Sequence, residues 1–436
     1  MKALSKTARV LLLQMLAIGS VFASYGAGRP EAAKQPLRWR GGAIQIAVSS
    51  SLTKQNPRIV NGSDVAGALR RSFQTWQRYV DFDLVQTTTD KQSISPAGAH
   101  GDGISVITIA QTPENALFFS NGLQESAAAT RVFYDKRGFV TEADIALNPY
   151  QDFSTDGTPG TFDLESTLTH EIGHLLGLEH SDVFGSTMHE KYGKNGAFGL
   201  PSYSARTLSQ ADITEIQRLY GANGTASCCQ KIEGTLISAD GPPRQWEVWA
   251  EDAQTGQVRA VAATDDQGNF FFSGLSRGSV LLFAQDKSGE IASPGELGTV
   301  TSSSDVTGIS KVVPSTKGNL KLEYLGFNGQ LSDIAVSLNA GKIYELYLGG
   351  TNLDPSKIKV GFTSPYLSVI PKTIASRDFG SEISVVSIDV QVDPNTPPGD
   401  YTVFVSEANG TKRYIVGGVT IEKFHNSFSK FSLTDE

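Results

Sequence analysis

The sequence predicts a multidomain protein in which an α+β domain is followed by all-β structure. Its 436 residues are enough for about two to four domains, each with a core of its own. Up to Gly221, strand patterns alternate with helical patterns. Past Gly221 the chain is rich in Gly, Ser and Thr, apolar residues alternate with polar ones, and no helical period of useful length remains.

The first 23 residues have the pattern of a secretory signal peptide. Lys2, Lys6 and Arg9 precede an apolar run at 10–21, and residues 21–23 offer a cleavage point. The run is shorter than the ~20 residues that a membrane-spanning helix needs, which argues against the alternative of an uncleaved anchor. We find no other stretch that could cross a bilayer, and we expect a secreted, extracellular protein.

The composition excludes one class of partner and is otherwise ordinary. A formal net charge of -8 without basic clusters argues against nucleic-acid binding. Hydrophobic residues make up 39% and charged residues 19%, as in soluble globular proteins. Residues 24–35 are small, polar and contain proline, which is typical of a linker.

Residues 36–223 are expected to form the α+β domain. Alternation over 44–48 predicts a half-buried strand, and apolar residues at helical spacing over 65–80 predict a helix that Ser63 or Asp64 can cap. Further strands are predicted at 82–85, 104–110, 127–134 and 144–148. A hairpin turn is predicted at 136–138, and a closing helix capped by Ser209 at 208–221.

The stretch at 169–181 carries the residues that point to a function. His170 and His174 are four residues apart, so on a helix they lie about 40° apart in azimuth and about 6 Å apart along the axis, and both can reach one metal ion. Asp163 can cap this helix. Gly177 is placed to end it, because a residue without Cβ can turn the chain back. The turn lets His180 approach as a third ligand.

This arrangement is that of a catalytic zinc site rather than a structural one. Three neutral imidazoles leave the fourth tetrahedral position of Zn²⁺ for water. Glu171 projects roughly 100° round the helix from His170, where it can take the proton of that water as the water attacks a carbonyl. The alternative is a helix whose histidines merely lie in its core or at its surface. Since three of only six histidines in the chain have this spacing, we predict a zinc-dependent hydrolase of peptide bonds.

The stretch HEIGHLLGLEHS resembles the metzincin signature HExxHxxGxxH, and Ser181 after the third histidine is similar to the matrixin branch, that of the matrix metalloproteases. Met188 in STMHEKY resembles the family's Met-turn, and Tyr192 stands where the family has a tyrosine by its specificity pocket. LSQADITEIQRLYG resembles the family's closing helix, and the loop at 193–207 resembles the one that borders the S1′ pocket.

The resemblance implies a twisted, mostly parallel sheet with three main helices and a secreted zinc endopeptidase that acts on proteins or peptides. It implies one catalytic Zn²⁺ held by His170, His174 and His180, with Glu171 as general base. It implies that Met188 packs beneath the imidazoles without binding the metal. For Tyr192 the alternative is a purely packed aromatic ring.

Two features depart from the family. The sequence contains no cysteine before Cys228, so latency through a prodomain cysteine is not expected. Only His100 is available for the family's second, structural zinc, and a tetrahedral site needs four donors, so we interpret His100-Gly101-Asp102 as a turn. Calcium bound through aspartate and backbone oxygens stays an open alternative.

The only two cysteines, Cys228 and Cys229, are adjacent. Because a bridge between neighbours is strained, a disulfide framework is not expected to hold the protein together. Free thiols, a vicinal pair and a link to another chain all remain open.

Residues 230–315 resemble the carboxypeptidase regulatory-like β-sandwich, and residues 318–425 resemble an immunoglobulin-like fold of the IPT/TIG kind, before a tail at 426–436. Neither shows convergent catalytic residues, so a spacer role or a site for an extracellular ligand is expected. The competing hypothesis is a catalytically inactive surface or matrix adhesin that binds through these two β-sandwiches. The sequence does not define the substrate.

Overall fold

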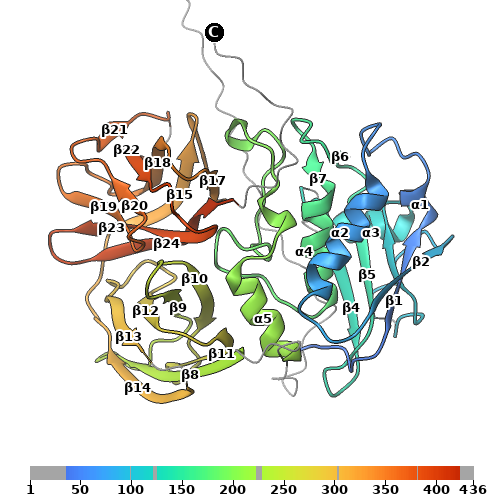
Figure 1. Cartoon of the computed structure of the whole chain (residues 1–436), viewed down its shortest axis with the longest axis horizontal. Coiled ribbons are helices and arrows are strands. Elements are labelled where there is room, and N and C mark those ends of the chain that lie inside the picture. The colour runs from blue at the N-terminus through green and yellow to red at the C-terminus, as the bar shows by residue number, and fades with distance from the viewer. Residues whose placement is uncertain are drawn as a thin grey trace, which may run out of the picture.

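The computed structural model describes residues 36–98, 100–120, 125–221, 228–301, 304–380 and 382–422. The predicted signal peptide, linker and tail lie outside these residues. Three hydrophobic cores define a first region (36–221), a second region (228–313) and a third region (318–422). In Figure 1 the first region lies on the right, and the two β regions lie one above the other on the left.

The first region is built on a five-stranded sheet in the order β2-β1-β3-β5-β4. Its strands are β1 Ile44–Ser49, β2 Leu84–Thr89, β3 Ser105–Thr108, β4 Ala128–Tyr134 and β5 Val140–Leu147. The pairings are parallel except that of β4 with β5, whose hairpin turn was predicted. β1 was predicted to be half-buried, but Ala47 is buried as well as Ile46 and Val48. The difference arises because β1 is an interior strand of a mostly parallel sheet.

Among the residues that the structure describes, five helices accompany this sheet: α1 Ser50–Thr53, α2 Val65–Gln77, α3 Pro113–Ser120, α4 Leu164–Leu175 and α5 Gln210–Tyr220. Short strands β6 Phe153–Ser154 and β7 Phe162–Asp163 precede α4, and 3₁₀ turns η1 Ala197–Gly199 and η2 Ser204–Arg206 precede α5. The predicted caps are confirmed, because the side chains of Asp64, Asp163 and Ser209 each accept a backbone hydrogen bond from the first turn of their helix.

The second region packs two small sheets face to face. Its strands are β8 Cys228–Ile237, β9 Glu247–Asp252, β10 Val258–Ala263, β11 Asn269–Ser276, β12 Val280–Gln285, β13 Gly295–Val300 and β14 Val306–Val312. One sheet has the order β10-β9-β12-β13 and the other β11-β8-β14. Side chains from both sheets, such as Val248 and Phe270, share one core. Cys228 and Cys229 form a disulfide with each other at the start of β8, so the vicinal pair is the alternative that the structure contains.

The third region also packs two sheets around one core. Its strands are β15 Lys321–Phe327, β16 Gln330–Ser332, β17 Val336–Leu338, β18 Ile343–Thr351, β19 Ile358–Phe362, β20 Leu367–Val369, β21 Ala375–Arg377, β22 Ser384–Val392, β23 Gly399–Glu407 and β24 Lys412–Ile421. One sheet runs β16-β15-β18-β22-β20, with β21 also on β22, and the other runs β17-β24-β23-β19. The predicted region of mostly β-strands after residue 221 is thus present.

The three regions meet in a shared apolar cluster, which we call the junction cluster. It consists of Val183 and Ala211 from the first region, Trp249, Val258 and Phe283 from the second, and Tyr414 and Val416 from the third. The rings of Trp249 and Phe283 stack with centroids 5.3 Å apart. α5 is the helix of the first region that faces the second region (Figure 1), where it lies against β10 and β11. No helix among the described residues is long and apolar enough to cross a membrane.

Candidate metal centre

The helix that carries the predicted ligands is one of the most buried elements of the first region. α4 begins at Asp163, whose side chain accepts a hydrogen bond from the backbone N–H of Ser166 at 2.8 Å. Its apolar side packs into the core through Leu168 and Ile172, both fully buried. The indole Nε1 of Trp76 on α2 donates to the carbonyl of Thr169 at 2.7 Å. The backbone that holds the imidazoles is therefore fixed from two sides.

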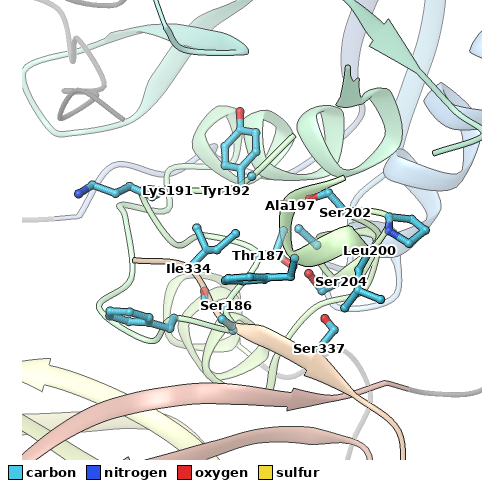
Figure 2. A pocket seen from close by; sticks show the side chains of 17 residues that line it. Ser186, Thr187, Lys191, Tyr192, Ala197, Leu200, Ser202, Ser204, Ile334 and Ser337 are labelled. Atoms are coloured by element: carbon cyan, nitrogen blue, oxygen red, sulfur yellow. The ribbon is translucent and has the colours of Figure 1, made fainter. Parts of the chain in front are cut away.

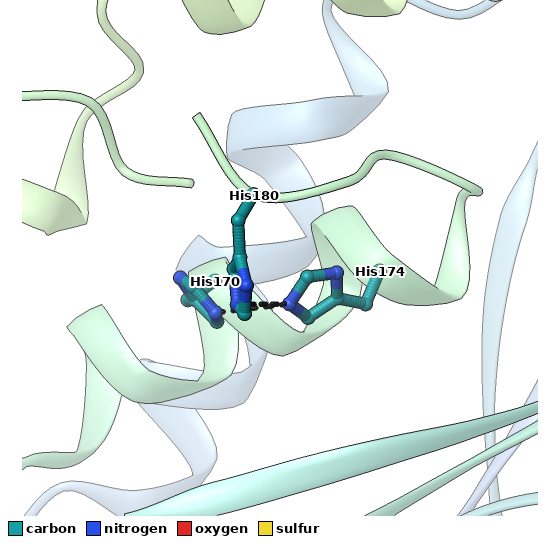
Figure 3. Close-up of side chains that lie close together, drawn as sticks. All are labelled: His170, His174 and His180. Carbon is teal, nitrogen blue, oxygen red and sulfur yellow. Dashed lines mark hydrogen bonds between the residues drawn. The ribbon is translucent and has the colours of Figure 1, made fainter. Parts of the chain in front are cut away.

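The structure brings the three predicted ligands together (Figure 3). His170 and His174 lie on successive turns of α4, and each is only 3% exposed. Gly177, with a φ of 98°, turns the chain after the helix and brings His180 back to the same point. The Nε2 atom of His174 lies 3.1 Å from Nε2 of His170 and 3.1 Å from Nε2 of His180.

Hydrogen bonds on the far side of two rings fix their tautomers. Nδ1 of His170 lies 2.7 Å from the carbonyl of Thr187, and Nδ1 of His174 lies 2.9 Å from the carbonyl of Leu178. A carbonyl can only accept, so both Nδ1 atoms carry the proton and both Nε2 atoms present a lone pair. Two lone pairs that face each other at this distance repel unless a cation lies between them.

The chemistry of this donor set fits zinc. Burial lowers the pKa of His170 to about 3 and that of His174 to about 4, and burial and the neighbouring histidines also lower the pKa of His180. All three imidazoles are therefore neutral near pH 7, as metal ligands must be. Nitrogens about 2.0–2.1 Å from a tetrahedral ion lie about 3.3 Å from one another, close to the separations found here.

Glu171 lies beside the ligands and is 2% exposed. Its Oε2 accepts a hydrogen bond of 2.6 Å from the hydroxyl of Thr130 on β4. Burial raises the pKa of Glu171 to about 7, and the hydrogen bond from Thr130 opposes that rise. A carboxyl group with a pKa near neutral can both take up and release a proton during a reaction.

Met188 lies beneath the α4 turn that carries the ligands. A Cβ added to Gly173 would come within 2.3 Å of the Met188 sulfur and 2.9 Å of the Trp76 ring, so only glycine allows this close approach. The turn around Met188 is held by the buried carboxylate of Asp212 on α5. Asp212 accepts from the backbone N–H groups of Thr187 and Met188 at 2.9 and 3.2 Å. Asp212 thus positions the residue whose carbonyl orients His170.

Tyr192 lies next to the first ligand. Its ring centroid is 5.2 Å from that of His170 and 6.0 Å from that of Phe162. Burial, followed by the charge of Glu171, raises the pKa of the Tyr192 phenol well above its usual value. Tyr192 is therefore a neutral side chain at one edge of the histidine cluster.

Tyr192 is also one of the residues that line a pocket (Figure 2). The first region contributes the turn around Met188 and the loop at 193–207, and the third region contributes the segment at 334–337. Among the residues labelled in Figure 2, Thr187 and Tyr192 link the pocket to the ligands, since the carbonyl of Thr187 accepts the hydrogen bond from His170.

The fragment at 100–102, which was considered for a second zinc, does not belong to a group of metal-binding side chains among the described residues. His100 is exposed, and Asp102 pairs with Lys91 at 2.8 Å. Within the parts of the chain that the structure describes, His170, His174 and His180 form the only group of three or more side chains that could hold a metal ion. The structure assigns no regular turn at 100–102, so the interpretation of this fragment as a turn is not confirmed.

Several residues at the site were not predicted. Thr130 lies on β4, and nothing in the sequence pattern of that strand marks this threonine as part of a site. Asp212 lies in the first turn of α5, where an acidic residue is ordinary. Asp212 at the third helical position after Ser209 fits a capping box, which could have marked its carboxylate as structural. Ile334 lies too far along the chain for any local pattern to place it near the histidines.

Comparison with known proteins agrees with the geometry. Residues 39–221 match the family model described as Matrixin. The chain is 30% identical over 195 residues to Metalloendoproteinase 1-MMP of Arabidopsis thaliana, which covers 43% of this chain and 45% of that protein. It is 28% identical over 199 residues to Metalloendoproteinase 1 of Glycine max, with coverage of 44% and 55%. The chain thus spans about half the length of these two relatives.

Solved structures with some likeness to the chain include the major pilin subunit BcpA of Bacillus cereus and the major pilin SpaD of Corynebacterium diphtheriae. BcpA shares 13% identity at a TM-score of 0.18, and the match covers 42% of this chain and 66% of BcpA. SpaD shares 11% identity at a TM-score of 0.19, with coverage of 44% and 65%. Likeness at this level carries no argument. From the family match and the plant relatives, we conclude that residues 39–221 form a matrixin domain, followed by a region made mostly of β-strands.

Proposed function

We propose that this protein is a secreted zinc-dependent endopeptidase in which His170, His174 and His180 hold the ion and Glu171 is the general base. The observation that carries the proposal is the convergence of three neutral Nε2 donors within 4.8 Å of one another. When bound, Zn²⁺ acts as a Lewis acid that polarises a carbonyl and lowers the pKa of water to about 7.

The residues of the chain supply the rest of the chemistry. Glu171 accepts the proton of the attacking water at its carboxylate and returns it to the leaving amine, which its pKa of about 7 allows. Thr130 holds Oε2 of Glu171 in place. The carbonyls of Thr187 and Leu178 hold the rings of His170 and His174 in one orientation.

The edge strand β4 can bind the backbone of an extended peptide, which supports peptide hydrolysis over other reactions. β4 is an edge strand of the sheet, and it carries Thr130, which contacts Glu171. An extended peptide can add to such an edge through main-chain hydrogen bonds. A peptide bound there lies across the catalytic carboxylate, with one side chain directed into the pocket beyond Tyr192.

The test is cleavage of an unstructured protein by the purified chain. Glu171→Gln is expected to keep zinc and to lose about 10²–10⁴-fold in kcat, the usual contribution of a general base. Glu233→Gln, which changes an exposed glutamate on β8, is the matched control and is expected to leave kcat unchanged. Unaltered cleavage by Glu171→Gln would show that the assigned mechanism is wrong.

Secretion rests on the pattern of the first 23 residues. The proposal expects that the protein recovered from the medium of expressing cells begins after Ala23, as determined by N-terminal sequencing. Protein that stays inside the cells with Met1 still present would contradict this part of the proposal.

A further inference from the structure

The pocket beside the histidines is built by two regions that are far apart in the sequence. Its lining includes Thr187, Tyr192 and Leu200 of the first region and Ile334 and Ser337 of the third region (Figure 2). Because the third region supplies one wall, the matrixin domain alone does not enclose the pocket.

The third region is fastened next to the metal ligands at two points. Lys191 forms an ion pair with the carboxylate of Asp333. The ring of His189 lies between the carbonyls of Ser181 and Asp333, 3.2 Å from each. These contacts fix the residue that directly precedes Ile334. Gly193 leaves room for Ile334, since a Cβ added there would lie 2.8 Å from the Ile334 Cδ1 atom.

The third region also holds the loop at 193–207. Phe198 in this loop is 3% exposed and packs into the core of the third region. Its φ of 57° is unusual for a bulky residue, and such a conformation persists only where the surroundings enforce it. The amide of Asn328 donates to the Phe198 carbonyl at 2.7 Å, and the Phe198 N–H donates to Oε1 of Gln330 at 2.6 Å.

The turn that presents these two side chains is itself rigid. Asn328 and Gly329 join β15 to β16 and have φ values of 50° and 72°. Positive φ at both residues is typical of the tight two-residue turn that Asn-Gly favours. At its other end the loop is tied to the first region, because Arg206 pairs with Asp163 at 2.5 Å. The loop is thus clamped between two regions.

We propose that the third region sets the side-chain specificity of the peptidase, with Ile334 as a specificity-determining residue and the Asn328–Gln330 turn as a positioning element for the loop. This inference rests on the proposed peptidase function. A substrate side chain next to the scissile bond enters between Tyr192 and Ile334, so the size of residue 334 limits the size of the side chain that fits.

The experiment uses the full chain and four peptides that differ only in the residue after the scissile bond, which is Ala, Leu, Phe or Trp. Ile334→Ala is expected to raise kcat/KM for the Trp peptide relative to the Leu peptide by about tenfold, since small changes in pocket size are worth about 10–200-fold. Ile343→Ala is the matched control, because Ile343 is exposed on β18 of the same region. Equal ratios in wild type, Ile334→Ala and Ile343→Ala would overturn the inference.

Two further measurements cover other outcomes. Ile334→Val removes one methylene, and we expect it to shift the ratio of kcat/KM for the Trp and Leu peptides in the same direction but by less. This variant keeps the test possible if Ile334→Ala does not fold. Gln330→Ala is expected to reduce the differences in kcat/KM among the four peptides while the zinc content stays the same. Unchanged differences would show that the turn does not position the loop.

Failure of the inference can be told from failure of the proposed function. If zinc-loaded wild type cleaves none of the peptides, the proposed function fails. Binding of the same four peptides, now with a fluorescent label, to wild type and Ile334→Ala then still decides whether Ile334 limits the size of the side chain that the pocket accepts. Identical affinities in the two proteins would overturn the inference, and tighter binding of the Trp peptide by Ile334→Ala would support it.

Discussion

The hydroxyl of Thr130 donates a hydrogen bond of 2.6 Å to Oε2 of Glu171. The bond joins the edge strand of the sheet to the helix that carries the histidines. It stabilises the charged form of the carboxylate, against a burial that raises the pKa of Glu171 to about 7. A single threonine thus opposes the effect of burial on the pKa of the proposed general base.

Thr130→Val keeps the shape of the side chain and removes the donor. Without the bond the charged carboxylate is less stable, so the pKa of Glu171 rises and the acid limb of kcat/KM against pH moves to higher pH, by about 1 unit for a bond to a charged group. Thr88→Val on the opposite edge strand, at an exposed position, is the control. An acid limb that stays where it is in Thr130→Val would contradict the role of this bond.

Zinc is expected to stay bound in mildly acidic solution. Histidine ordinarily titrates near pH 6.5, but burial lowers the pKa of His170 to about 3 and that of His174 to about 4. Protons therefore compete with the metal for these ligands only at lower pH. Zinc content measured after dialysis should be unchanged at about pH 5.5. Release of zinc with a midpoint pH near the ordinary histidine pKa would show that burial does not lower the pKa values of these imidazoles.

Asp212→Ala should destabilise the protein and disturb the metal centre together. The substitution leaves the backbone N–H groups of Thr187 and Ser209 and the hydroxyl of Ser186 without their acceptor. Each orphaned buried donor costs about 1–3 kcal/mol, so the free energy of unfolding in urea should fall by more than that of a typical surface variant. Glu215→Ala, which breaks a surface pair on the same helix, should change it by no more than about 0.5 kcal/mol. Similar losses in the two variants would contradict the assigned role.

The contribution of Asp400 to the stability of the protein should fall as pH rises from acid to neutral. Asp400 is 3% exposed at the boundary of the first and third regions, and burial raises its pKa to about 7. Its folded pKa lies above its unfolded one, so its contribution is fully present below the unfolded pKa of about 4 and is lost as pH passes through 7. Asp400→Asn should flatten this dependence by up to about 1.4 kcal/mol per pH unit, as measured by urea unfolding. Glu323→Gln at an exposed position of β15 should leave the slope as it is.

Local patterns in the sequence were sufficient for the parts of the site that lie on one helix. The spacing of His170 and His174 and the caps at Asp163 and Ser209 depend only on helical geometry, and the structure contains them. α3 was missed because Ala116 to Phe119 form a continuous apolar run rather than a stripe, a pattern that does not indicate a helix.

The remaining features depend on contacts between distant segments. Thr130 reaches Glu171 only because β4 is the edge strand beside α4. Ile334 reaches the pocket only because the third region packs on the first. One contact between these regions is the hydrogen bond of 2.9 Å from the backbone N–H of Phe184 to the carbonyl of Val416. A single sequence contains no local signal for such pairings, since they depend on how separately folded layers pack.

The junction cluster has a consequence for the order of events during synthesis. Val183 and Ala211 leave the ribosome well before Trp249 and Phe283, and before Tyr414 and Val416, which bury them in the finished protein. The newly made matrixin domain therefore exposes an apolar surface while translation continues. A nascent chain that stops after this domain would hold all three proposed zinc ligands but remain prone to association with other unfinished chains.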